Sequence, residues 1–118
     1  MKPILVALNE TLGARGSMVV SNDGLPICSV VGADTQVDRL AAMGAAILSD
    51  VRKSLAAAGM SSFTQCEVAA EMGKVILVAA GPTYLLVLTG PRMEIGPGSV
   101  EILSAARHVA RASELTPA

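Results

Sequence analysis

Apolar residues recur with a helical period in three segments of the chain. The first segment covers residues 2–12, and Gly13 is suited to end it. The longest segment begins at Thr35, with Asp38 three residues later in a capping-box-like arrangement, and ends at Gly59. The last segment begins near Ser99. Its inward positions are predicted to be Ile102, Leu103, Ala106, Val109 and Ala110.

Five shorter runs have the pattern of β-strands. They cover residues 17–21, 25–31, 63–71, 74–80 and 84–89. The first two runs are joined by Asn22–Asp23–Gly24, residue types that tolerate the backbone angles of a tight hairpin. We therefore interpret this tip as a turn and not as a ligand site. The last two runs are almost continuously apolar, so both of their faces should be covered.

The turns and one proline predict the order of the strands. Short connections pair strand 1 with strand 2, strand 3 with strand 4, and strand 4 with strand 5. Pro26 cannot donate to a ladder and places strand 2 at one edge, while the polar face of strand 3, with Gln65, Glu67 and Glu71, suits the other. The predicted fold is an α/β sandwich with element order α-β-β-α-β-β-β-α and an antiparallel sheet in the order 2-1-5-4-3. The long helix should cover one face and the two terminal helices the other.

Composition limits the classes of function. The 118 residues fit one domain, 1–118, and are 52% hydrophobic and 16% charged, with a formal net charge of −1. This balance argues against nucleic-acid binding and against anionic membranes. No leader peptide and no membrane-length apolar run is evident, so we expect a cytoplasmic protein. Cys28 and Cys66 are expected to be buried free thiols on opposite edges of the sheet.

Catalytic chemistry lacks the residues it would need. His108 is the only histidine and has no predicted serine or cysteine partner. The glycine-rich loop 90–98 lacks the spacing and the lysine of a phosphate-binding loop. The acidic residues are scattered singly, so no metal site or carboxylate pair emerges. We expect no catalytic residue, metal or cofactor.

The long helix has an unusual outer face. Residues 40–49, "LAAMGAAILS", carry no charge. On a helical wheel, Ala42, Ala45, Ala46 and Ser49 are predicted to face away from the sheet, flanked by charged residues at positions 39, 50 and 53. Alanine is also a good helix former on an exposed surface, which is the alternative explanation. A small, apolar strip is typical of an interaction surface, and we favour that interpretation.

These segments together resemble the roadblock/dynein-light-chain domain family, in particular its small bacterial members. The resemblance rests on "GARGSMVVSNDGLPICS", on the small-residue helix "DTQVDRLAAMGAAILSDVRKSL" and on the strand pair "GKVILVAAGPTYLLVLT". It covers nearly the whole chain and includes no catalytic motif. It implies a homodimer in which the long helices pair and the third strands join edge to edge. The dimer interface would then include Ala42, Ala45, Ala46, Ser49, Gln65 and Glu67.

The resemblance also implies a partner, because small bacterial members often regulate a Ras-like small GTPase. The surface implied to bind it comprises Arg39, Ala42, Met43, Ala46, Ser49, Asp50 and Lys53. A dimeric scaffold or adaptor that leaves nucleotide turnover unchanged is the alternative. A small-molecule sensor or minor enzyme is a third possibility, which the scarcity of aromatic residues (Phe63 and Tyr84) disfavours.

Overall fold

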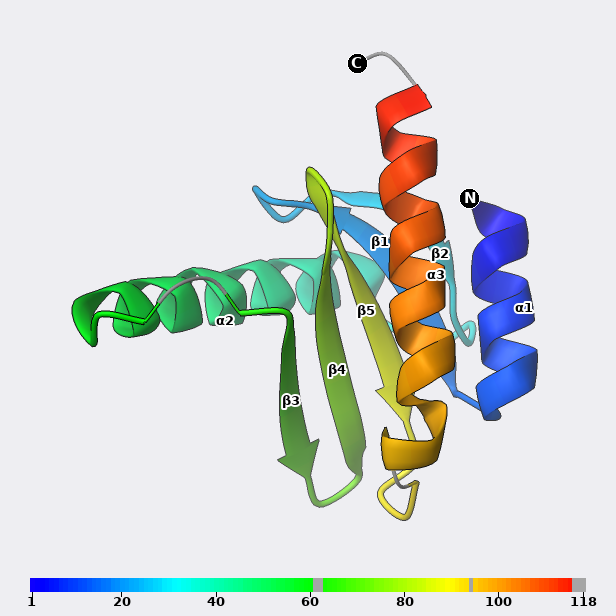
Figure 1. Ribbon diagram of the computed structural model, residues 1–118. Helices are drawn as coiled ribbons and strands as arrows, with labels where there is room; N and C mark the ends of the chain where they lie inside the picture. Colours follow the sequence, from blue (N-terminus) through cyan, green and yellow to red (C-terminus); the bar gives the residue numbers. More distant parts are fainter. Residues whose placement is uncertain (61–62, 94, 116–118) are drawn as a thin grey trace.

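A computed structural model describes residues 1–60, 63–93 and 95–115. The elements are α1 (Lys2–Leu12), β1 (Gly16–Ser21), β2 (Pro26–Val30), α2 (Val37–Ala57), β3 (Gln65–Ala70), β4 (Gly73–Ala80), β5 (Thr83–Thr89) and α3 (Ile95–Leu115). All strand pairs are antiparallel, in the order β2-β1-β5-β4-β3. The predicted strand order is therefore confirmed, with β2 and β3 at the two edges (Figure 1).

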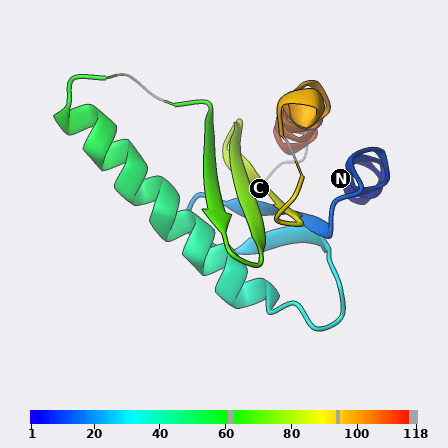
Figure 2. The same cartoon turned by 90° about the horizontal axis from the view of Figure 1, so that it is seen from below.

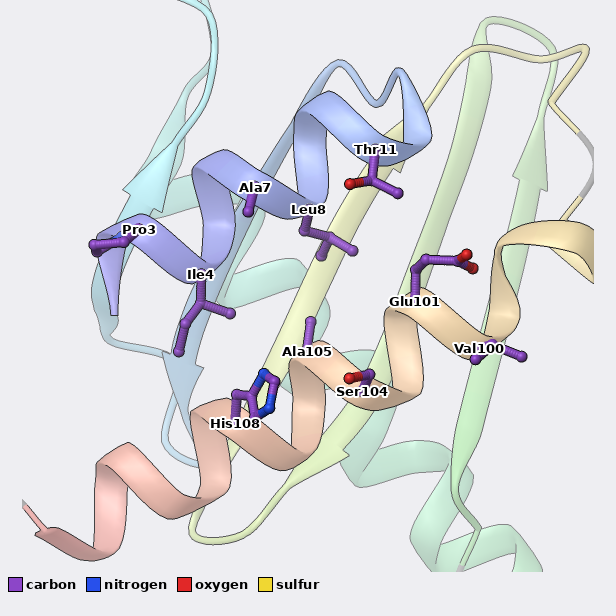
Figure 3. A pocket seen from close by; sticks show the side chains of 10 residues that line it. All are labelled: Pro3, Ile4, Ala7, Leu8, Thr11, Val100, Glu101, Ser104, Ala105 and His108. Atoms are coloured by element: carbon purple, nitrogen blue, oxygen red, sulfur yellow. The ribbon is translucent and has the colours of Figure 1, made fainter.

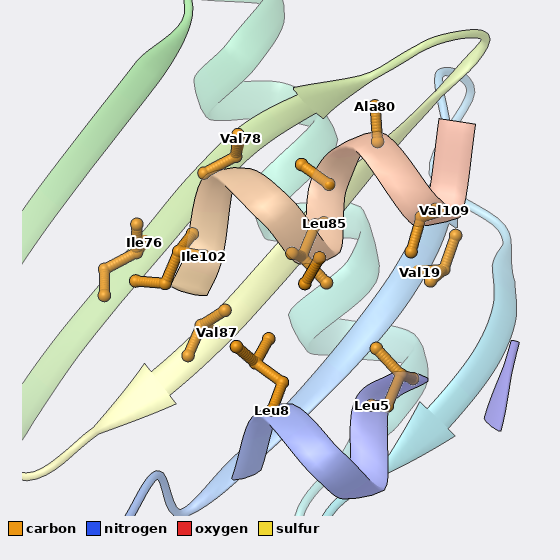
Figure 4. Close-up of a cluster of buried hydrophobic side chains, with 12 residues drawn as sticks. Leu5, Leu8, Val19, Ile76, Val78, Ala80, Leu85, Val87, Ile102 and Val109 are labelled. Atoms are coloured by element: carbon orange, nitrogen blue, oxygen red, sulfur yellow. The ribbon is translucent and has the colours of Figure 1, made fainter. Parts of the chain in front are cut away.

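The helices form two layers around the sheet. Helices α1 and α3 lie side by side on one face, and α2 covers the other face alone (Figure 2). On the α1/α3 side, α1 lies over β1 and β2, and α3 lies over β4 and β5. Leu5 and Leu8 of α1 and Ile102 of α3 join Val19, Ile76 and Val87 of the sheet in one buried cluster (Figure 4). Because successive strand residues point to opposite faces, Tyr84 and Leu86 of β5 pack instead against α2. The predicted three-layer arrangement is confirmed.

Tyr84 fixes α2 against the sheet. Its hydroxyl donates a hydrogen bond of 2.7 Å to the carbonyl oxygen of Ala41, and the side chain is fully buried. Burial raises the pKa of Tyr84 to about 12, partly offset by the nearby backbone N–H of Ala45. Gly44 allows this approach, since a Cβ there would lie 2.8 Å from the Tyr84 hydroxyl.

The Asn22–Asp23–Gly24 tip is a turn, as predicted. Gly24 has φ 92°, a backbone angle that glycine adopts without strain. The side-chain amide of Asn22 donates to the carbonyl of Pro82 at 2.9 Å, which ties this hairpin to the β4–β5 turn. The tip therefore braces two hairpins against each other.

Both later helices begin at residues other than those predicted. The backbone N–H of Thr35 donates to the carbonyl of Gly32 at 3.0 Å, which closes a separate turn, and α2 begins two residues later at Val37. Helix α3 begins at Ile95, before the expected Ser99. A proline in a first helical turn loses no hydrogen bond, so the Gly–Pro–Gly stretch is compatible with a helix start.

Leu103 was expected to face inward from the last helix, and this is wrong. Its side chain is 39% exposed. It lines a hollow beside β4, together with Val78 and Ala106. The neighbouring Ile102 is fully buried and takes the core position instead.

Candidate partner-binding surface

The outer face of α2 carries most of the residues that the sequence singled out. Exposed side chains on this helix include Arg39, Ala42, Met43, Ala46, Asp50 and Lys53. Ser49 lies beside them and is half-buried. The helical repeat of 3.6 residues explains the grouping, because Arg39, Met43, Ala46 and Asp50 are separated by three or four positions. The predicted partner-binding residues thus share one helix face.

Ala45 does not lie on the outer face, contrary to the sequence-based expectation. It is half-buried and packs with the residues between α2 and the sheet. A Cβ added to Gly24 would lie only 3.3 Å from the Ala45 Cβ, so Ala45 meets the β1–β2 hairpin tip. Ala45 is one helical turn from both Ala41 and Leu48, which are buried, and this spacing places it on the same side.

The second half of α2 extends past the edge of the sheet (Figure 2). The buried residues of this helix are Ala41, Gly44 and Leu48, all before its last nine positions. Beyond them, Val51 and Leu55 continue the inward stripe but are only half-buried. The overhanging half therefore presents apolar surface with no sheet beneath it.

Strand β3 is the neighbouring edge of the sheet. It pairs only with β4 among the described residues, so its other edge leaves backbone groups unpaired. Gln65 is half-buried and Glu67 is exposed, with a Glu67–Lys74 ion pair at 3.6 Å to β4. On the α2 side of this strand, Val68 is 36% exposed. Such an edge can accept another strand.

Three exposed apolar residues on or beside these elements were not anticipated. They are Met60 at the end of α2, Val68 in β3 and Met72 in the β3–β4 turn. Met72 is 77% exposed, and the Arg15 guanidinium donates to its carbonyl at 2.8 Å. A methionine in a two-residue hairpin turn has no core to face, which is a sequence clue that could have identified it. We call the outer face of α2, its overhanging half and the β3 edge together the α2–β3 surface.

The opposite layer contains a groove between α1 and α3. Its volume is about 510 Å³, and Figure 3 shows Pro3 and Ile4 near His108 at one end, with Thr11 near Glu101 at the other. His108 is exposed on α3. No cluster of three or more His, Cys, Asp or Glu residues that could hold a metal occurs in the part of the chain that the structure describes. The same residues include no helix long and apolar enough to cross a bilayer.

Comparison with known proteins identifies a family for this chain. A family model described as the Roadblock/LC7 domain matches residues 2–89. The uncharacterised protein MJ0310 of Methanocaldococcus jannaschii is 36% identical over 93 residues, which cover 79% of this chain and 82% of that protein. Myxococcus xanthus MglB superposes with a TM-score of 0.90 at 16% identity, covering 98% of this chain and 95% of that one. A Roadblock/LC7 domain from Streptomyces avermitilis gives 0.87 at 20% identity and covers 98% of both chains.

Proposed function

The chain belongs to the Roadblock/LC7 family, and on that premise we propose that it forms a homodimer which regulates a Ras-like small GTPase and catalyses no reaction itself. The observation that carries the proposal is the outer face of α2. Between Ala42 and Ser49 this face is uncharged and, apart from Met43, small, and Arg39, Asp50 and Lys53 edge it. A helix that met only water there would usually be polar.

The α2–β3 surface supports the homodimer. Val51, Leu55 and Met60 leave apolar surface uncovered on the overhanging half of α2, while β3 offers an unpaired strand edge beside it. A second copy related by a two-fold axis would cover both at once, because an isologous interface uses the same patch on each subunit. Gln65 and Glu67 lie on the joining strand in this arrangement, and Ala42, Ala46 and Ser49 lie along the paired helices.

The GTPase would dock on the outer surface of the paired helices. Small side chains at Ala42 and Ala46 allow a partner element to approach the helix closely, while Met43 supplies an adaptable apolar contact. Arg39, Asp50 and Lys53 form a charged rim of the kind that steers association and sets orientation. Binding should favour the GTP state, because the γ-phosphate orders the switch loops of such GTPases.

A dimeric adaptor is the second candidate, and the exposed methionines favour it. Met43, Met60 and Met72 are 40%, 61% and 77% exposed. Flexible thioether side chains repack against differently shaped partners, which suits a scaffold that tethers several proteins. In this function the dimer binds its partners and leaves nucleotide turnover unchanged.

One experiment separates these functions. The protein is mixed with the small GTPase of its own genome, loaded with GTP or with GDP, and both complex formation and phosphate release are measured. Binding to the GTP form with a changed rate of release supports the regulator. Binding with an unchanged rate supports the adaptor, and absence of binding in both states contradicts the GTPase proposal. Light scattering on the protein alone tests the homodimer, which a single-chain mass would contradict.

A further inference from the structure

The α1/α3 layer carries a second apolar surface, remote from α2. Val6 is 37% exposed on α1, and Val100 is 69% exposed on α3. Between the helices lies the groove of about 510 Å³ (Figure 3), and a second hollow of about 460 Å³ follows the outer side of α1 from Lys2 to Glu10. In the proposed homodimer this layer stays free, because α2 and β3 lie on the other side of the sheet and at its edge.

Charges divide the layer into a basic end and an acidic end. The two helices run antiparallel, so the start of α1 lies beside the later turns of α3 (Figure 1). Lys2 on α1 and His108 on α3 therefore mark the basic end, and Glu10 and Glu101 mark the acidic end. One carboxylate oxygen of Glu101, Oε2, is buried and has no hydrogen-bond partner within the described residues. A cation or N–H donor beside this carboxylate would offset the loss of solvent.

The charges of α1 are placed against the helix dipole. Lys2 occupies the first helical position, where the partial positive charge of the dipole disfavours a cation, and Glu10 lies in the last turn, where an anion is disfavoured. Neither side chain forms an ion pair in the part of the chain that the structure describes. Both placements are unfavourable to the isolated helix, and both charges remain available for a contact outside the protomer.

We propose that the α1/α3 layer binds the same layer of a second copy of this chain, about a two-fold axis that crosses the groove near Val6 and Ser104. Rotation about such an axis places α1 antiparallel on the partner's α1 and α3 antiparallel on the partner's α3. Lys2 then meets the partner's Glu10, and His108 meets the partner's Glu101. Glu101 and His108 lie equally far along α3 on either side of the axis, so they can meet across it. The two-fold symmetry makes each contact occur twice.

The packing chemistry agrees with this pairing. Small side chains at Ala7, Ser104 and Ala105 lie at the centre of the groove, where the two copies would approach each other closely. Val6 and Val100 supply apolar area on either side of that centre. This interface is separate from the proposed α2–β3 dimer, so a chain that uses both surfaces assembles beyond two copies.

The test is a charge swap on α1 followed by sedimentation velocity and light scattering. Wild-type protein should exceed the mass of two chains at micromolar to sub-millimolar concentration. Lys2→Glu and Glu10→Lys should each weaken this association about tenfold, because one substitution creates two like-charged contacts. The double variant Lys2→Glu/Glu10→Lys should restore it, while the matched reversal Asp34→Lys, in the exposed loop before α2, should leave it unchanged.

Assembly beyond two chains rests on the proposed α2–β3 homodimer as well as on the α1/α3 interface. Substitutions on each of these two surfaces tell the two interfaces apart. Ala46→Arg should leave two chains joined through α1/α3, and Ala46→Arg/Glu10→Lys should give single chains. A wild-type mass that never exceeds two chains and falls to one with Ala46→Arg alone overturns the α1/α3 interface while the homodimer stands. A Glu10→Lys variant that assembles beyond two chains as readily as the wild type also overturns the α1/α3 interface. Failure of the double swap to restore association also overturns the inference and leaves the layer to a different class of partner.

Discussion

The hydroxyl of Tyr84, in the middle layer, donates its hydrogen bond to the main-chain carbonyl of Ala41, in the helix above it, at 2.7 Å. This contact occurs where Gly44 leaves space for the phenol ring. It fixes the height of α2 over the sheet at the start of the helix, while the second half of α2 extends past the sheet edge (Figure 2). Tyr84 therefore helps to set the position of the outer face on which the proposed partner binds.

Gly44 and Tyr84 should be energetically coupled. Tyr84→Phe removes one hydrogen bond and should lower the free energy of unfolding by about 1 kcal/mol. Gly44→Ala places a Cβ 2.8 Å from the Tyr84 hydroxyl, so it should destabilise the protein despite alanine's helix propensity. In the Tyr84→Phe background the clash with the hydroxyl is gone, and Gly44→Ala should cost about 1 kcal/mol less. Urea denaturation of the four proteins measures this coupling, and strictly additive effects would contradict it.

Tyr84 should also make the protein sensitive to alkaline pH. Burial raises its pKa from the ordinary value of 10.0 to about 12. The folded state therefore holds the phenol proton more tightly than the unfolded state. The contribution of the neutral phenol to the free energy of unfolding is complete below pH 10 and is lost as the pH rises from about 10 toward 12. The slope attributable to this group approaches about 1.4 kcal/mol per pH unit. The free energy of unfolding of wild type and of Tyr84→Phe is measured by denaturation at several alkaline pH values. If it falls equally with pH in both proteins, Tyr84 is not the group responsible.

Cys28 and Cys66 should not form a disulfide within one chain. Both are free and half-buried, on β2 and β3 at opposite edges of the sheet. Four strand spacings separate them by roughly 19 Å, whereas a disulfide requires Cα atoms about 4.4–6.8 Å apart. After mild oxidation, peptide mapping should recover no peptide pair linked within a single chain. The control is Cys28→Ser, which should leave the oxidised products of Cys66 unchanged.

The strand order could be predicted because its determinants are local. Short turns such as Gly81–Pro82 force neighbouring strands to pair, and Pro26 is compatible only with an edge. With both edges assigned, β1 had to join β5. The start of α2 could not be placed in the same way. Thr35 belongs to a turn closed on the Gly32 carbonyl, and Gln36 precedes the helix without a side-chain capping bond.

The candidate surface could be predicted only in part, because exposure depends on distant elements. The helical period placed Arg39, Met43 and Ala46 on one face of α2. Ala45, one turn from the buried Ala41 and Leu48, lies instead on the inner side, where it meets the hairpin tip at Gly24. Met60 is exposed since α2 continues past the sheet, and no local pattern encodes that overhang. The sequence therefore predicted which residues share the outer face of α2, but not the overhang of the helix or the exposed residues around it.

Charge reversal on the α2 rim should weaken binding of the GTP-loaded GTPase. Lys53 is exposed at the edge of the small, uncharged strip and lies on the proposed docking face, whereas Lys2 is exposed on α1 in the opposite layer. Lys53→Glu should lower the association rate constant and reduce affinity about tenfold, with an effect that shrinks at high salt. Lys2→Glu is the matched control, since it makes the same change of charge without touching α2. The comparison is made by stopped-flow binding at low protein concentration, after light scattering has shown that the two variants retain the same dimer mass. Equal losses for both variants would mean that only net charge matters, and the α2 face would then not be the docking surface.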